Sequence, residues 1–262
     1  MTSKTLPDHE GGGREEPLAG NVTSGVVRVG DTVRRPAGAW TPAVDAFLAH
    51  LHREGFTGAP RPLGRDAMGR QVLEYVPGDT GDHNGTYTPE ELVAIGRMVR
   101  GLHDAAGRFA PPPDARWYCP IPPDRAELVC HNDVSPWNLV RSGGRWVLID
   151  WDYAAPASRG WEVAYAAQTC GGLSAERDPA EAATRLAAFV DGYGADPATR
   201  RELPGLLGRR ARAMVDLLRR GARDGVQPWA RIHAENGAYW AATARYLDRH
   251  VEVWRQAISP AA

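Results

Sequence analysis

The chain has 262 residues, 43% of them hydrophobic, which is enough to bury a core in one large domain or in two lobes that share a cleft. Its 31 basic and 32 acidic residues give a formal net charge of -1, which provides no field to hold a polyanion, so we expect no nucleic-acid partner. Three cysteines without C-x-x-C spacing, and no stretch near the ~20 apolar residues of a membrane span, favour a cytoplasmic protein with reduced thiols and no membrane contact.

The first segment, residues 1–17, is polar and is predicted to be a disordered tail. It contains Lys4, the only lysine of the sequence. The segment from Leu18 to Arg35 is rich in β-branched residues and is interrupted at Gly30-Asp31, which predicts two strands joined by a tight turn.

A helix of about three turns is expected to follow Thr41, which can act as the N-cap, and to end at Gly55. The next expected strand lies in RQVLEYVPGD and is closed by Pro77-Gly78. The folded residues up to this point are therefore mostly β-structure with one helix.

Beyond residue 88 helical patterns dominate, beginning with an apolar stripe at Leu92, Ile95, Met98, Val99 and Leu102. A β-hairpin is expected at Gly143-Gly144. Further helices are predicted at Ala183–Tyr193, Ala198–Arg223 and Ala230–Trp254. The pattern predicts an α+β, bilobal protein with a β-rich front lobe at 18–78 and a larger, mainly helical back lobe at 79–262.

The segment HNDVSPWN, residues 131–138, and the segment LIDWD that ends at Asp152 carry the most informative chemistry. A transferring phosphoryl group spreads negative charge over its oxygens, so its transfer needs a metal held by oxygen ligands and a carboxylate that accepts the proton of the attacking hydroxyl. Asp133 can be that carboxylate, and Asn138 and Asp150 can hold Mg²⁺. The predicted hairpin would bring the two ligand-bearing ends together.

These two segments resemble the catalytic loop H-x-D-x-x-x-x-N and the metal strand I-D-[FWC]-[DE] of the aminoglycoside phosphotransferase and choline kinase family, which belongs to the protein-kinase-like superfamily. The resemblance implies a protein-kinase-like fold and a small-molecule kinase that uses ATP or GTP with Mg²⁺. It also implies that His131 is a scaffold residue and that Glu162, in WEVAY, braces the catalytic loop in place of an aspartate.

Two segments of the front lobe resemble the nucleotide-binding parts of this family. LAGNVTSGVVRV resembles the flap over the triphosphate, with Gly20, Asn21, Thr23 and Ser24 as candidates for phosphate contact. LEYVPGD resembles the segment that links the lobes, and there Glu74, Tyr75 and Val76 are the candidates for contact with the base.

The sequence departs from the family at the lysine of the third strand, because no lysine follows Lys4. Arg34 or Arg35 is the expected substitute, since arginine keeps its charge and offers a planar fork to phosphate oxygens. Strand alternation lets only one of the two face the cleft. The spacing in the resembled family favours Arg35. Asp45 is the expected acidic partner that orients this cation. The change leaves open a weak or inactive nucleotide-binding protein.

The acceptor is expected between the catalytic loop and the C-terminal helices, where Asp152, Tyr153 and Glu235 are candidate contacts. A strand through Asp150 and Asp152 would put both carboxylates on one face. The acceptor could be an aminoglycoside, an amino alcohol, a sugar or another antibiotic. A metal-dependent hydrolase that uses Asp133, Asp150 and Asp152 stays open as a different class. We expect a monomer or a homodimer.

Overall fold

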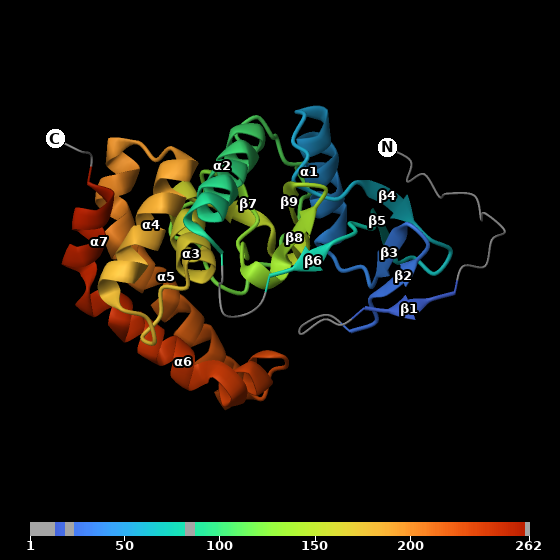
Figure 1. Cartoon of the computed structure of the whole chain (residues 1–262). Coiled ribbons are helices and arrows are strands. Elements are labelled where there is room, and N and C mark those ends of the chain that lie inside the picture. The colour runs from blue at the N-terminus through green and yellow to red at the C-terminus, as the bar shows by residue number, and fades with distance from the viewer. Residues whose placement is uncertain (1–13, 19–23, 82–86, 260–262) are drawn as a thin grey trace.

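A computed structural model describes residues 14–18, 24–81 and 87–259 of the chain (Figure 1). Its first sheet has five antiparallel strands in the order β1-β2-β3-β5-β4. These strands are β1 (Glu16–Pro17), β2 (Val27–Val29), β3 (Thr32–Arg35), β4 (Pro62–Arg65) and β5 (Gln71–Glu74). β1 differs from the expected disordered tail, because Glu16 and Pro17 pair with Arg28 and Val27 of β2. Residues 1–13 lie outside the described residues.

The first helix, α1 (Thr41–Arg53), packs beside this sheet and buries the predicted apolar face, including Phe47 and Leu51. The helix begins at Thr41, and Trp40 rather than Thr41 is its N-cap. The hydroxyl group of Thr41 accepts a 2.8 Å hydrogen bond from the backbone N–H of Gly38, before the helix, and not from an N–H of the first turn as an N-cap would. The helix ends before Gly55, whose positive φ of 78° suits glycine.

The middle of the chain forms two small sheets. Their strands are β6 (Asp79–Thr80), β7 (Leu128–Cys130), β8 (Leu139–Ser142), β9 (Arg145–Leu148) and β10 (Ala155–Ala157). The predicted hairpin joins β8 and β9, and both Gly143 and Gly144 have positive φ angles, as a tight hairpin turn requires. β7 pairs antiparallel with β10, which places the loop after β7 next to the segment between β9 and β10.

Six helices complete the described fold besides α1: α2 (Pro89–Ala106), α3 (Arg159–Gly171), α4 (Pro179–Tyr193), α5 (Pro197–Asp224), α6 (Trp229–Arg249) and α7 (Val251–Ile258). The predicted helix over Ala230–Trp254 is wrong as a single element, because the chain breaks between α6 and α7 at His250. The break lets Trp254 and Ile258 turn into the core, where both are fully buried beside α4.

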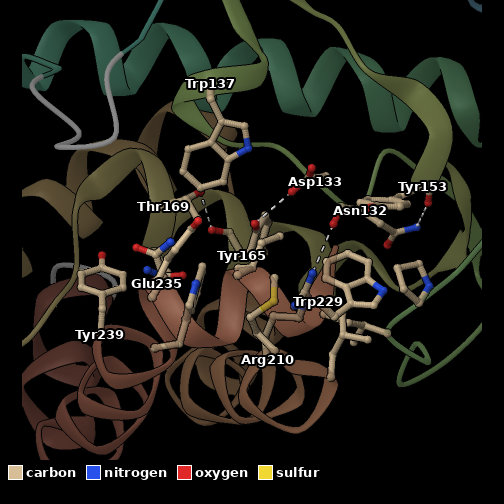
Figure 2. A pocket seen from close by; sticks show the side chains of 18 of the residues that line it. Asn132, Asp133, Trp137, Tyr153, Tyr165, Thr169, Arg210, Trp229, Glu235 and Tyr239 are labelled. Atoms are coloured by element: carbon tan, nitrogen blue, oxygen red, sulfur yellow. Dashed lines mark hydrogen bonds between the residues drawn. The ribbon is translucent and has the colours of Figure 1, made fainter. Parts of the chain in front are cut away.

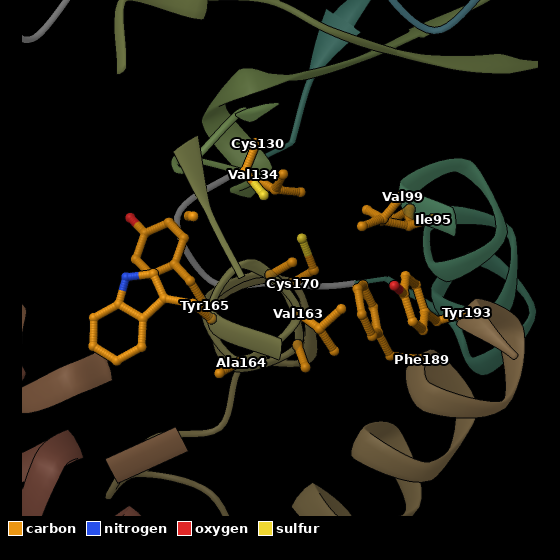
Figure 3. Packing of buried hydrophobic residues seen from close by; sticks show 14 of the residues in the cluster. Ile95, Val99, Cys130, Val134, Val163, Ala164, Tyr165, Cys170, Phe189 and Tyr193 are labelled. Atoms are coloured by element: carbon orange, nitrogen blue, oxygen red, sulfur yellow. The ribbon is translucent and has the colours of Figure 1, made fainter. Parts of the chain in front are cut away.

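The helical core is centred on α3, which is covered by α2, α4 and α5 (Figure 3). Ile95 and Val99 of α2 and Phe189 of α4 point toward Val163 of α3, and all four are fully buried. The α2 and α4 backbones approach closely at Gly96, where an added Cβ would lie 2.3 Å from the carbonyl oxygen of Phe189.

The structure confirms the α+β class, with a sheet-rich N-terminal part and a helical C-terminal part (Figure 1). Within the described ranges, none of the helices combines the length and the apolar character that crossing a bilayer requires.

Candidate functional site

The loop that follows β7 is held by a buried acid from α3. Oε1 of Glu162 accepts a 2.6 Å hydrogen bond from the backbone N–H of Asn132, and its Oε2 lies 2.6 Å from Nε2 of His103 on α2. Asn132 has a positive φ of 65°, and its side chain donates to the carbonyl oxygens of Tyr153 and Ala155 at 3.1 and 3.0 Å. These contacts fix the backbone immediately before Asp133.

His131 connects the same loop to the end of β9. Its Nδ1 accepts a 3.2 Å hydrogen bond from the backbone N–H of Asp133, so Nε2 carries the proton that is donated to the carbonyl oxygen of Ile149 at 3.0 Å. Burial lowers the pKa of His131, which keeps the ring neutral. Both ring nitrogens are thus engaged with the backbone, as a scaffold residue requires.

The carboxylate of Asp133 is oriented by two side chains. The hydroxyl group of Tyr165 donates to Oδ1 at 2.9 Å, and Nδ2 of Asn138 donates to Oδ2 at 2.8 Å. Removal from water and the nearby charge of Asp150 raise the pKa of Asp133 to about 7, against the hydrogen bond from Tyr165 and the charge of Arg210. A carboxyl group with such a pKa is a suitable proton acceptor near neutral pH.

Asn138 and Asp150 lie at neighbouring ends of the β8–β9 hairpin. The backbone N–H of Ile149, the residue before Asp150, donates a 2.9 Å hydrogen bond to the carbonyl oxygen of Asn138. This bond brings Asp150 close to Asn138. Nδ2 of Asn138 serves Asp133, so its oxygen is the atom suited to a cation. A carboxylate and an amide oxygen are the ligands that Mg²⁺ prefers, so these residues fit a magnesium ion chemically.

Arg35, and not Arg34, faces this group of residues. The guanidinium group of Arg35 is buried, and its Nη2 donates to Oδ1 of Asp150 at 2.8 Å and to Oδ2 of Asp152 at 2.5 Å. Burial opposes its charge, but the two carboxylates outweigh burial and raise the pKa of Arg35. Arg34 lies on the other face of β3, where Nη1 is 3.6 Å from Asp66.

The prediction that Asp45 orients this cation is wrong. Asp45 on α1 accepts a 2.6 Å hydrogen bond from Gln71 and lies 3.7 Å from Arg65. The long side chain of Arg35 reaches across to the carboxylates that follow β9, so its charge is balanced there and not by the helix.

Asp152 does not share a strand with Asp150, because residues Trp151–Tyr153 form a 3₁₀ turn and Asp150 has a left-handed backbone with φ of 61°. Oδ1 of Asp152 accepts a 3.0 Å hydrogen bond from the indole of Trp40. Asp150 and Asp152 both line a small cavity of about 320 Å³, which Ser24 also borders. Asp152 is therefore next to the metal candidates and belongs to this small cavity.

The remaining nucleotide candidates are separate from this group. Gly20, Asn21 and Thr23 lie outside the described residues. Glu74 pairs with Thr32 at the far end of β5, about 10 Å along the strand from the position opposite Arg35. The guanidinium group of Arg28 stacks over the ring of Tyr75 at 3.9 Å. Val76 is half-buried.

A cavity of about 670 Å³ opens beside Asp133, between the catalytic loop, α3, α5 and α6 (Figure 2). Tyr153 and Glu235 both line it, which brings two of the three predicted acceptor contacts together with Asp133. Glu235 is exposed and forms a 2.9 Å ion pair with Arg231. The third candidate, Asp152, is not among its described lining residues.

Sequence reasoning missed Arg210, which is buried in the wall of this cavity. Its guanidinium group lies 4.2 Å from the ring of Tyr165, and its Nη2 donates to the carbonyl oxygen of Asn132 at 3.2 Å. The signal was present, because Arg210 continues the apolar stripe of Leu203 and Leu207 along α5. A charged residue at such a position indicates a site.

Comparison with known proteins identifies the family of the chain. Residues 115–203 match the sequence profile of the phosphotransferase enzyme family. The trifolitoxin immunity protein of Rhizobium leguminosarum bv. trifolii is 35% identical over 191 residues, which are 68% of this chain and 73% of that protein.

Solved structures with the same fold are more distant in sequence. A choline/ethanolamine kinase family protein from Mesorhizobium loti has a TM-score of 0.64 at 17% identity, covering 96% of both chains. A microcompartment-associated aminopropanol kinase has a TM-score of 0.64 at 15% identity, covering 92% of this chain and 93% of the other. An amicoumacin kinase, in complex with AMP-PNP, has a TM-score of 0.63 at 13% identity, covering 95% and 90%.

Proposed function

Because the chain belongs to the phosphotransferase enzyme family, we propose that it transfers the γ-phosphate of ATP or GTP to a hydroxyl group of a small acceptor, in a reaction that requires Mg²⁺. One observation carries the proposal. The carboxylate of Asp133, held by Tyr165 and Asn138, borders a cavity large enough for an acceptor. It is also close enough to Asp150 for the charge of Asp150 to raise its pKa.

In this proposal Asp133 accepts a hydrogen bond from the acceptor hydroxyl and takes its proton as the new O–P bond forms. Tyr165 and Asn138 hold the carboxylate in one orientation, so little reorganisation is needed during the reaction. Glu162 and Asn132 have an indirect role, because their hydrogen bonds fix the backbone of the loop that carries Asp133.

Asn138 and Asp150 are the residues that would hold the magnesium ion. When bound, Mg²⁺ would neutralise charge on the phosphate oxygens. In this proposal Arg35 takes the role of the family's lysine and contributes a permanent positive charge beside Asp150 and Asp152.

A screen of hydroxyl-bearing compounds with γ-labelled ATP and GTP tests the proposal, since it covers donor, acceptor and activity together. We expect label to appear in an acceptor, and we expect Asp133→Asn to reduce the transfer rate by at least ~10²-fold while the thermal melting curve is unchanged. Full activity of Asp133→Asn would show that another group accepts the proton.

A second candidate is a weakly active or inactive nucleotide-binding protein. The observation that favours it is the engagement of Arg35 with both Asp150 and Asp152, which competes with a metal ion for the same oxygens. Thermal melting with Mg-ATP or Mg-GTP separates the two. Stabilisation by nucleotide without label transfer to any compound in the screen would favour the second candidate.

The name of the relative, an immunity protein for trifolitoxin, supports a more specific proposal about the acceptor. We propose that the acceptor is a toxic compound and that its phosphorylation protects the cell. Expression of the chain in a bacterium sensitive to a compound identified by the screen should raise the tolerated concentration. Expression of Asp133→Asn at the same level should not.

A further inference from the structure

The large cavity is bigger than a small amino alcohol needs. Its volume of about 670 Å³ lies in the middle of the ~300–1,000 Å³ range of pockets that enclose most of a drug-sized ligand. Asp133 lies at its wall between two ends, with Trp229 toward one end and Tyr239 toward the other (Figure 2). An acceptor that fills the cavity therefore extends in both directions from its reacting hydroxyl group.

The wall of the cavity is rich in aromatic rings. Tyr153 and Trp229 lie with ring centroids 6.0 Å apart, and Tyr165 and Trp240 lie 6.3 Å apart with nearly parallel planes. Trp137 borders the cavity from the catalytic-loop side (Figure 2). Tyr165 is 2% exposed and Trp229 and Trp240 are each 7% exposed, so these rings are packed firmly in the wall. The parts of them that border the cavity offer rigid apolar contact to a flat or apolar ligand, with modest cost in side-chain entropy.

The charged residues that line the cavity can neutralise few ammonium groups of a ligand. Its described lining residues include three acids, Asp133, Glu176 and Glu235, and two arginines, Arg210 and Arg231. Asp133 is assigned to the reaction, and Glu235 is paired with Arg231 at 2.9 Å. Glu176 is then the acid best able to receive one ammonium group. Each further ammonium group would lose its hydration without a carboxylate partner, at a cost of several kcal/mol.

Arg210 adds a permanent positive charge next to the reacting position. It is 4% exposed, and its guanidinium group lies 4.2 Å from the ring centre of Tyr165 and 5.6 Å from that of Trp161. Among the residues that the structure describes, its buried Nη1 has no hydrogen-bond partner, so one face of the guanidinium group is left without a hydrogen bond. In such an enclosed place, like charges repel much more strongly than in water.

We propose that the acceptor is a drug-sized alcohol with extended ring or apolar surface and at most one positive charge. The inference rests on the phosphotransferase function proposed above. The apolar part packs toward Trp229 and Tyr153, and a single ammonium group, where present, lies toward Glu176. A polycationic aminosugar does not match this cavity.

Calorimetric titration of the full chain with a series of alcohols tests the inference. The series shares one aryl skeleton and carries zero, one, two or three ammonium groups, with choline as the small member. We expect the neutral and singly charged members to bind at least about tenfold more tightly than the triply charged member and choline. Affinity that rises with each added ammonium group, or tighter binding of choline, would overturn the inference.

Binding is measured without nucleotide, and label transfer is measured separately, so the two proposals fail in different ways. Tight binding of the apolar members without transfer of label to any of them contradicts the kinase function. Transfer to the triply charged member in preference to the others contradicts the acceptor class while the kinase function stands.

Two variants connect the selectivity to named residues. Trp229→Ala should weaken binding of the neutral aryl alcohol by about tenfold or more, whereas Met68→Ala, at a side chain that is 75% exposed in the N-terminal part, should leave it unchanged. Arg210→Met should reduce the difference in binding affinity between the triply charged and the neutral members, because it removes the positive charge that repels ammonium groups. Unchanged selectivity in a folded Arg210→Met variant, or equal effects of Trp229→Ala and Met68→Ala, would contradict the assignment.

Discussion

The guanidinium group of Arg35 donates a 2.8 Å hydrogen bond to Oδ1 of Asp150, the carboxylate that we assign to the metal. The same nitrogen contacts Asp152 at 2.5 Å. An arginine thus joins the first sheet to the segment after β9, on the strand where the sequence resemblance led us to expect a substitute for lysine. One buried cation, the guanidinium group of Arg35, therefore balances the negative charges of both Asp150 and Asp152.

Arg35→Met should reduce phosphoryl transfer by at least ~10²-fold, because it removes the positive charge beside both carboxylates. Arg35→Lys should retain more activity than Arg35→Met, since it keeps the charge but loses the planar fork. Arg34→Met is the matched comparison, and steady-state kinetics of the three variants provide the measurement. A larger loss for Arg34→Met than for Arg35→Met would mean that the wrong arginine has been assigned.

Asp150→Asn should abolish the thermal stabilisation that Mg-ATP gives to the wild-type protein, because it removes a charged ligand of the metal. Asp216→Asn, at an exposed position of α5, is the matched control and should respond to Mg-ATP like the wild type. Addition of excess chelator should remove the effect from the wild type as well. Equal stabilisation of the Asp150→Asn variant would exclude Asp150 from the metal site.

Asn132→Ala should destabilise the protein more than Asn132→Gly, by about 1 kcal/mol. Both variants lose the hydrogen bonds to the carbonyl oxygens of Tyr153 and Ala155, but only alanine is strained at a φ of 65°. Urea unfolding of the two variants measures the difference. Equal stability of the two would mean that the left-handed backbone at this position is not maintained.

Glu162 should make the stability depend on pH in the acidic range. Burial acts to raise the pKa of its carboxyl group, but the hydrogen bond and charge of His103 outweigh burial and hold the folded-state pKa below the ordinary value of 4.5. Its contribution is therefore complete above the unfolded-state pKa and is lost as the pH falls through the lower folded-state pKa.

Glu162→Gln should accordingly flatten the fall in unfolding free energy below about pH 4.5. Glu252→Gln, on the exposed face of α7, is the control and should keep the wild-type slope. Denaturant titrations at a series of pH values measure these slopes. A Glu162→Gln variant with the wild-type slope would contradict the depressed pKa.

The features that local sequence patterns determine were predicted well. The β8–β9 hairpin follows from two glycines between alternating residues, and α2 follows from its apolar stripe. The proximity of Asn138 and Asp150 could be predicted because a tight hairpin brings its two ends together. The alternation of side chains along a strand predicted that only one of Arg34 and Arg35 faces the cleft, and the spacing in the resembled family favoured Arg35.

Features that depend on contacts between distant segments could not be predicted in this way. α3 is buried along nearly its whole length, so it has no polar face to define a helical period. The partner of Arg35 was assigned to Asp45, because sequence spacing does not show how far an arginine reaches across a cleft. The break at His250 depends on where α7 packs against α4, which no local signal encodes.

The single-turnover rate of phosphoryl transfer to a bound acceptor, compared between the wild type and Asp133→Asn, tests the central claim most directly. Calorimetric titration first establishes that both proteins bind the acceptor and Mg-nucleotide equally well. We predict a rate for Asp133→Asn that is at least ~10²-fold lower at equal occupancy. Equal rates for the two proteins would contradict the account.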